Sequence, residues 1–181
     1  MKEVKKRTAL NAGEIQEVLD RIVAEMISDY PQTERLVLIG IRTGGAFLAN
    51  RIREMIKEKK GLEIPTGALD ITLYRDDWTR INHKPIIGKT EVPVSLDNKI
   101  VILVDDVLYT GRTVRAALDA LIDFGRPCRI SLAVLVDRGG RELPISADYS
   151  GIQIDTKSIQ RINVDLKELG KNDQVVIESE E

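Results

Sequence analysis

The stretch Val101-Ile-Leu-Val-Asp-Asp-Val-Leu-Tyr-Thr-Gly-Arg-Thr113 decides the fold of this chain. Its first four residues are apolar and predict a buried β-strand that ends at two adjacent carboxylates, Asp105 and Asp106. A short turn with threonine and glycine follows. Apolar residues then recur at the spacing of a helix: Val114, Ala117, Leu118, Leu121 and Ile122. We therefore expect a strand, an acidic pair, a small-residue loop and a helix in direct succession.

This succession suits a ligand that carries both a phosphate and a sugar. Backbone amides of the loop and the N-terminus of the following helix can bind a phosphate. The paired carboxylates can accept hydrogen bonds from two vicinal hydroxyl groups. The loop has neither the lysine of a Walker A motif nor the three glycines of a dinucleotide-binding turn. A phosphorylated sugar is thus favoured over a nucleoside triphosphate or a dinucleotide.

The composition predicts one globular domain that comprises residues 1–181. The chain is 43% hydrophobic and 31% charged, and its 181 residues suffice for a full hydrophobic core. We expect neither a membrane span nor a signal peptide, because no apolar run reaches the necessary length. The single cysteine, Cys128, excludes an internal disulfide and favours a cytoplasmic protein; we expect it in the core or at its boundary. The net charge of −2 provides no general attraction for nucleic acid.

Strands and helices alternate along the chain, which predicts an α/β fold with a central parallel sheet flanked by helices. A helix begins after Asn11, a suitable N-cap with Glu14 three residues later, and ends before Pro31. Apolar runs and stripes place the other elements: strands at 36–41, 68–73, 99–104, 129–136 and 174–177, and helices at 46–60 and 113–124.

Two loops between strands and helices are expected at one edge of this sheet. Parallel α/β sheets bind ligands outside the carboxyl ends of their strands. That edge would hold both the loop after Asp106 and the earlier loop Arg42-Thr43-Gly44-Gly45. Two glycines and a cation permit an anion to approach the backbone closely, although an ordinary strand-to-helix turn explains them equally well. Residues 75–94 are polar and irregular, and we predict a mobile loop there.

At residues 101–113 the chain resembles the type I phosphoribosyltransferases, whose signature for phosphoribosyl pyrophosphate (PRPP) is an apolar strand, two acidic residues and Thr-Gly-x-Thr. The resemblance implies that Asp105, Asp106, Arg42 and Arg75 take part in catalysis. It also implies that the loop at about 75–94 is a lid that shields a cationic sugar from water. The implied contacts of ribose and 5′-phosphate are Asp105, Asp106, Val107, Tyr109, Thr110, Gly111, Arg112 and Thr113, and those of pyrophosphate are Arg42, Thr43, Gly44 and Gly45.

Three blocks, residues 69–77, 105–117 and 132–145, resemble the PyrR family. Its members make UMP from uracil and PRPP, and bind messenger RNA to attenuate pyrimidine operons. The resemblance implies uracil phosphoribosyltransferase activity, Mg²⁺ as cofactor, mRNA as a partner, a homo-oligomer, and a small hood mainly at about 137–160. The residues implied at the base and hood are Val136, Asp137, Arg138 and Arg141, of which Asp137 is also a candidate contact of Mg²⁺ with pyrophosphate.

Two glycines depart from the pattern of the PyrR family. Gly44 stands where the family usually has arginine, and Gly140 where it usually has histidine. Acidic residues, among them Asp20 and Asp29, also stand on the first helix, where RNA-binding members are basic. Three hypotheses remain open: an active uracil phosphoribosyltransferase, a UMP-sensing attenuator that binds mRNA with little catalysis, and a phosphoribosyltransferase for another base such as a purine.

Overall fold

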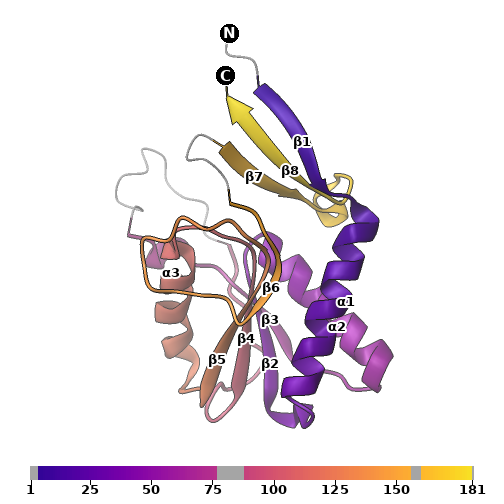
Figure 1. Ribbon diagram of the computed structural model, residues 1–181. Helices are drawn as coiled ribbons and strands as arrows, with labels where there is room; N and C mark the ends of the chain where they lie inside the picture. The colour runs from indigo at the N-terminus through magenta and orange to yellow at the C-terminus, as the bar shows by residue number, and fades with distance from the viewer. Residues whose placement is uncertain (1–3, 77–87, 156–159, 181) are drawn as a thin grey trace.

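Two β-sheets organise the molecule, whose computed structural model describes residues 4–76, 88–155 and 160–180 (Figure 1). The large sheet has five strands in the order β3-β2-β4-β5-β6, and every neighbouring pair is parallel. The predicted α/β architecture with a central parallel sheet is therefore confirmed. The strands are β2 (Leu36–Ile41), β3 (Thr66–Leu69), β4 (Ile100–Leu108), β5 (Arg129–Asp137) and β6 (Tyr149–Gln153).

Helices cover both faces of the large sheet (Figure 1). On one face lie α1 (Ala12–Asp29) and α2 (Gly44–Lys60), and on the other lies α3 (Arg112–Leu121). Successive strand residues point to opposite faces, so Leu38 joins the core under α1 and α2 whereas Val37 joins the core under α3. Because both faces are buried, the central strands are unbroken apolar runs rather than alternating ones.

The start of α1 confirms the predicted capping box. The backbone N–H of Glu14 donates to the Asn11 side chain at 3.1 Å, and the Asn11 N–H donates to the Glu14 carboxylate at 2.8 Å. The helix ends at Asp29, before Pro31, as predicted. Short 3₁₀ segments occur at Thr33–Arg35, Thr72–Tyr74, Ile122–Phe124 and Lys167–Leu169.

Several sequence predictions differ from the structure. The strand predicted at 68–73 is β3 at Thr66–Leu69, and a 3₁₀ segment occupies Thr72–Tyr74. Strand β4 continues to Leu108 instead of ending at Val104, because its pairing with β5 extends to the last residues of both strands. Helix α2 begins at Gly44 rather than at residue 46, so both glycines of the predicted loop belong to its first turn. Cys128 is exposed, and the prediction of a position in the core or at its boundary was wrong: the strand that follows it starts with exposed Arg129 and enters the core only later.

The small sheet joins the two ends of the chain above the carboxyl ends of the large sheet (Figure 1). It consists of β1 (Val4–Leu10), β8 (Gln174–Glu180) and β7 (Gln160–Asp165), in this order and antiparallel. Strand β1 was not predicted, because three consecutive basic residues interrupt its apolar pattern. Within the described part of the range 137–160 predicted for a hood, β6 belongs to the large sheet, and only Gln160 belongs to the small one.

The predicted loop at 75–94 is described only in part, because residues 77–87 lie outside the described ranges. Its last part returns to the edge of the large sheet. Glu91 forms an isolated antiparallel bridge with Ala68, with two backbone hydrogen bonds of 2.7 and 2.9 Å. Among the described residues, no helix combines the length and the apolar character that crossing a membrane would require.

Candidate functional site

The acidic pair lies at the carboxyl end of β4, the central strand of the large sheet. Asp105 is 6% exposed. Its carboxylate accepts a hydrogen bond of 2.9 Å from the backbone N–H of Asp106, and the Asp106 carboxylate accepts one of 2.7 Å from Val107. These bonds hold both carboxylates in defined orientations, and each carboxylate has further lone pairs with which to accept hydrogen bonds from a ligand.

Burial makes this pair electrostatically unusual. Burial raises the pKa of Asp105 well above its usual range, and the neighbouring charge of Asp106 raises it further. Burial also raises the pKa of Asp106, against the lowering effect of the hydrogen bond from Val107. The two carboxyls consequently titrate as one coupled pair. A ligand that donates hydroxyl hydrogens or brings positive charge relieves the repulsion, so the pair suits a sugar or a developing cation.

A cavity of about 370 Å³ opens at this edge of the large sheet, and we call it the large-sheet cavity. Its walls come from the carboxyl ends of β2, β3 and β4 and from the start of α3. The predicted site residues that it brings together are Arg42, Thr43, Gly44, Arg75, Asp105, Asp106, Val107 and Thr113, and the residues that it adds are Asp70, Ile71 and Thr72.

The turn after β2 approaches β4 closely at two glycines, where Gly44 faces the movable Asp106 side chain and Gly45 faces the backbone. A Cβ atom on Gly44 would lie 2.3 Å from a carboxylate oxygen of Asp106, and one on Gly45 would lie 2.2 Å from the backbone oxygen of Val104. The peptide bond between Arg42 and Thr43 is cis. The Arg42 guanidinium donates to the backbone oxygen of Lys89 at 2.6 Å. Because Gly44 and Gly45 lack side chains, the backbone amides of this turn and the Arg42 cation can lie beside the two carboxylates of the acidic pair.

Asp70, at the end of β3, is a site residue that the sequence analysis did not single out. Its carboxylate accepts hydrogen bonds from the backbone of Thr72, at 2.7 Å, and of Gly88, and its own N–H donates to Thr90 at 3.1 Å. Burial would raise the pKa of Asp70, but the hydrogen bonds from Thr72 and Gly88 and the charge of Arg42 lower it below its usual range. An acidic residue at the end of a neighbouring parallel strand was the signal that could have located it.

The loop between β4 and α3 forms a second, smaller hollow of about 220 Å³. Gly111 has φ +92°, a conformation that favours glycine, and α3 begins immediately after it. The Arg112 guanidinium joins two other segments, with 2.5 Å to Asp76 and 2.6 Å to Glu142. The hollow combines cations and hydroxyl groups with a helix N-terminus, which is a suitable environment for a phosphate. Its lining residues are Arg75, Asp76, Thr110, Arg112 and Thr113.

The residues predicted at the base and hood form a compact cluster behind the loop. Asp137 and Arg141 form an ion pair of 2.6 Å, and Arg141 donates to the backbone oxygen of Tyr109 at 2.9 Å. The Arg138 guanidinium lies 3.8 Å from the centre of the Tyr109 ring. Val136 is fully buried. None of the four residues lines the large-sheet cavity or the hollow beside it, so their contact with a base stays a prediction.

A further cavity of about 390 Å³ lies between the acidic pair and the small sheet, and we call it the small-sheet cavity. It meets the large-sheet cavity at Asp106 and Val107, which line both. The sequence analysis missed it, because its other walls come from both ends of the chain. Those lining residues are Lys6, Ile162, Asn163, Val164, Asp165, Lys171, Gln174, Val176 and Glu178.

Comparison with known proteins agrees with this geometry. The family model described as phosphoribosyl transferase domain matches residues 9–169. The chain belongs to this family. Within this family, the relatives that the chain resembles at more than 50% identity are named bifunctional protein PyrR. The relative from Deinococcus deserti is 55% identical over 170 residues, with coverage of 94% of this chain and 93% of the relative. The relative from Syntrophobacter fumaroxidans is 51% identical over 172 residues, with coverage of 95% and 92%. The predicted membership of the PyrR family is confirmed.

Solved phosphoribosyltransferases share the fold at lower identity. A hypoxanthine phosphoribosyltransferase from Staphylococcus aureus superimposes with a TM-score of 0.69 at 22% identity, covering 94% of this chain and 90% of that one. The hypoxanthine phosphoribosyltransferase of Trypanosoma cruzi gives a TM-score of 0.72 at 17% identity, covering 97% of both chains. At these identities the likeness establishes the type I phosphoribosyltransferase fold alone.

Proposed function

We propose that this PyrR-family protein is a uracil phosphoribosyltransferase, which transfers ribose 5-phosphate from PRPP to N1 of uracil and releases pyrophosphate. One observation carries the proposal: the acidic pair stands where two cavities meet. Asp105 lines only the large-sheet cavity, whereas Asp106 and Val107 line both. This arrangement suits a transfer between two substrates, with the donor on one side of the reacting carbon and the acceptor on the other.

In this proposal the large-sheet cavity binds PRPP. Asp105 and Asp106 accept hydrogen bonds from the ribose hydroxyls and stabilise positive charge at the anomeric carbon. The amides of Arg42 to Gly45, with the Arg42 and Arg75 guanidinium groups, bind the departing pyrophosphate. Residues 109–113 bind the 5′-phosphate at the N-terminus of α3. Positioning and charge then supply most of the catalysis. The bond to pyrophosphate breaks as the bond to N1 forms, and the N1 proton of uracil passes to the departing pyrophosphate or to solvent.

Mg²⁺ fits this site as a partner of the substrate rather than as a resident ion. Within the described residues, no group of three or more His, Cys, Asp or Glu side chains is arranged to hold a metal ion. The large-sheet cavity instead offers the carboxylates of Asp70, Asp105 and Asp106. Magnesium in phosphate chemistry uses one or two carboxylates together with substrate oxygens. When bound, it would neutralise charge on pyrophosphate. Asp137 remains a predicted contact.

The small-sheet cavity would bind the acceptor base against Val107. Polar side chains from the small sheet face this space, and Asp165 forms bonds with Lys171, at 2.6 Å, and with Gln174, at 3.1 Å. Amide, carboxylate and ammonium groups can together donate to and accept from the edge of a pyrimidine. The cluster of Asp137, Arg138 and Arg141 would support this side of the site by holding the loop at Tyr109.

The test is release of pyrophosphate from PRPP and Mg²⁺ with uracil, in parallel with hypoxanthine, guanine, adenine and orotate. We expect turnover with uracil and little with the other bases. Turnover with a purine but not with uracil would contradict the choice of base while retaining the phosphoribosyltransferase. If no base supported turnover although UMP or PRPP bound tightly, the site would act as a sensor and the catalytic proposal would be abandoned.

RNA binding is the second candidate function, and membership of the PyrR family favours it. The name of the relatives assigns them two functions. We propose that a homo-oligomer in the cytoplasm binds the leader mRNA of pyrimidine genes with UMP as signal. Filter binding of such a leader at several salt concentrations tests this. Specific binding enhanced by UMP supports it, and binding of all RNAs that vanishes equally with salt refutes it.

A further inference from the structure

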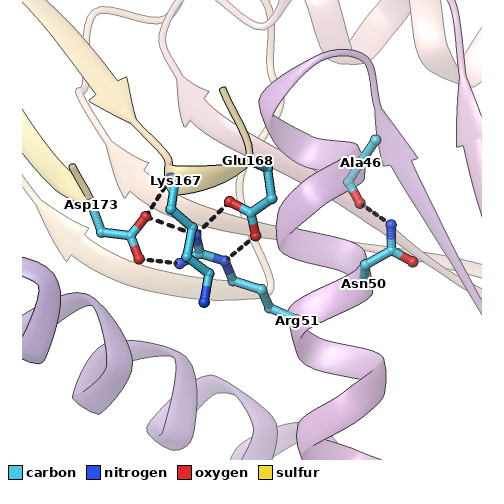
Figure 2. A network of polar contacts seen from close by, with 6 residues as sticks. All are labelled: Ala46, Asn50, Arg51, Lys167, Glu168 and Asp173. Carbon is cyan, nitrogen blue, oxygen red and sulfur yellow. Dashed lines mark hydrogen bonds and ion pairs between the residues drawn. The ribbon is translucent and has the colours of Figure 1, made fainter. Parts of the chain in front are cut away.

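Helix α2 contacts both sides of the site. Its first turn contains Gly44 and Gly45, which lie against the acidic pair. Within two further turns, roughly 10 Å along the axis, the helix carries Arg51. The Arg51 side chain points away from α2 to the segment 166–173 that connects β7 with β8 (Figure 2). One rigid element thus links the pyrophosphate turn to the small sheet.

Arg51 binds two carboxylates of this connection at the same time (Figure 2). Its Nε and Nη2 donate to the two oxygens of Glu168 at 2.8 and 2.6 Å. Its Nη1 and Nη2 donate to the two oxygens of Asp173 at 2.9 and 2.8 Å. Asp173 also accepts a hydrogen bond of 2.8 Å from the backbone of Lys167, which closes the connection into a compact loop. Four of the five guanidinium N–H groups are therefore directed at this loop.

The side chains of this network are well shielded from water. The Arg51 and Asp173 side chains are each 14% exposed, and that of Glu168 is 25% exposed. Charge-assisted, two-point bonds of this kind define both distance and orientation. A lysine could supply charge at one point but could not reproduce the planar fork. The network therefore holds the connection at a defined distance and orientation from α2, which an exposed surface ion pair would not do.

The connection held by Arg51, together with the residues at its two ends, contributes side chains to the lining of the small-sheet cavity. Lys171 belongs to the connection itself, and Asp165 and Gln174 stand at its two ends. We propose that Arg51 is a positioning residue for the acceptor base: it sets the distance between this wall and Asp106 without touching either substrate. The inference rests on the proposed function, because it assigns the acceptor to the small-sheet cavity.

The small sheet has other anchors, so loss of Arg51 leaves the chain folded. Leu166, the first residue of the connection, and Val175, in β8 just after it, are fully buried in the core under α1 and α2. Strand β8 keeps its pairing with β1 and β7. Without the Arg51 guanidinium, the connection can shift relative to α2 while these anchors stay in place. A small displacement of the cavity wall disturbs the productive geometry of a bound substrate far more than it disturbs the fold.

The experiment compares Arg51→Met and Arg51→Lys with the control Arg53→Met. Arg53 lies on the same helix but pairs only with its neighbour Glu54 in the described structure. For Arg51→Met we expect KM for uracil to rise at least about tenfold, with KM for PRPP changed less than about twofold. Arg51→Lys should fall between Arg51→Met and wild type. Arg53→Met should match wild type in both constants.

Hydrogen exchange provides a readout that does not need turnover. In Arg51→Met we expect faster exchange of amides in 160–165 and 174–180 and unchanged exchange in 100–108. Equal rises in both KM values, or no change in KM for uracil, would overturn the inference in a protein that turns over uracil. Absence of turnover in wild type would instead reject the proposed function. In that case the affinity for UMP, measured by calorimetry, tests the positioning role. Weaker binding in the Arg51 variants but not in Arg53→Met supports that role, and equal affinity in all variants contradicts it.

Discussion

The two cavities differ in how the chain builds them, although they share Asp106 and Val107. The large-sheet cavity consists of short stretches that directly follow β2, β3 and β4. The small-sheet cavity consists of β1, β7, β8 and the connection between β7 and β8. Short stretches at the ends of three neighbouring strands form the first, whereas segments from the two ends of the chain form most of the second. A donor site can therefore be identified from local sequence, but an acceptor site of this kind cannot.

They also differ in what stabilises them. Asp105 directly follows four strand residues, Val101 to Val104, that are buried between two cores. The small-sheet cavity depends more on ion pairs, such as Lys6 with Glu178 and Lys171 with Asp165, whose lysine side chains are 66% and 58% exposed. Exposed pairs contribute little stability. We expect the acceptor side to open locally more readily than the donor side, and the following changes test that difference.

The largest effect should come from Asp105→Asn combined with Asp106→Asn. Asparagine keeps the shape of each side chain but removes the charge that stabilises a cationic sugar. We expect kcat to fall by at least about 100-fold, comparable to the loss of a preorganised electrostatic contact. Steady-state release of pyrophosphate measures it, and circular dichroism verifies the fold. Unchanged turnover in this variant would show that the acidic pair has no part in the reaction.

Gly45→Ala should break the contact between the pyrophosphate turn and β4. A Cβ atom here meets the backbone oxygen of Val104 at 2.2 Å, so helix and strand must separate. We expect a loss of about 1–3 kcal/mol in the free energy of unfolding, typical of overpacking, together with a rise in KM for PRPP. Urea denaturation and kinetics measure the two effects.

Gly13→Ala is the matched control for this substitution. Gly13 lies in α1, and a Cβ atom there is 3.4 Å from its nearest neighbour, the Asn11 side chain. Alanine should leave activity unchanged and stabilise the helix slightly, because glycine costs more conformational entropy in a helix. Equal loss of stability in both variants would mean that the close approach of Gly45 to β4 is unimportant.

Arg112→Gln should affect substrate binding more than stability. Arg112 joins Asp76 and Glu142 on an exposed surface, where ion pairs contribute little to folding. If its guanidinium or its loop contacts the 5′-phosphate, KM for PRPP should rise about tenfold, the effect of one charge-assisted hydrogen bond. KM for uracil should change little. A rise confined to uracil would instead place Arg112 on the acceptor side.

Asp105→Asn should have the smallest effect, on the pH dependence of stability. Burial and the charge of Asp106 raise the pKa of Asp105 in the folded protein above its unfolded value. The folded state therefore retains a proton that the unfolded state loses, and stability decreases as pH rises from about 4. Asparagine removes this penalty. Thermal unfolding should show a higher Tm than wild type at neutral pH, with a difference that shrinks toward pH 4. A lower Tm at neutral pH would contradict the assigned direction.

Sequence reasoning succeeded where local pattern determines structure. The capping box at Asn11, the six apolar residues of β2 and the acidic end of β4 were correctly located, since each follows from residues close together in the chain. The extension of β4 to Leu108 was missed, because pairing with β5 decides where a strand ends. Strand β1 was missed because basic residues hide an edge strand that forms only beside β8.

The 101–113 motif and the alternating apolar runs sufficed to predict the fold class and most residues of the large-sheet cavity, though not Asp70, because parallel strands necessarily present their following loops at one edge. Tertiary structure alone decided the rest. It closed the small sheet from the two ends of the chain, brought Lys6 and Lys171 to one cavity, and joined Arg51 to Glu168 and Asp173. Such contacts link residues more than 100 positions apart, and no local periodicity encodes a pairing at that distance.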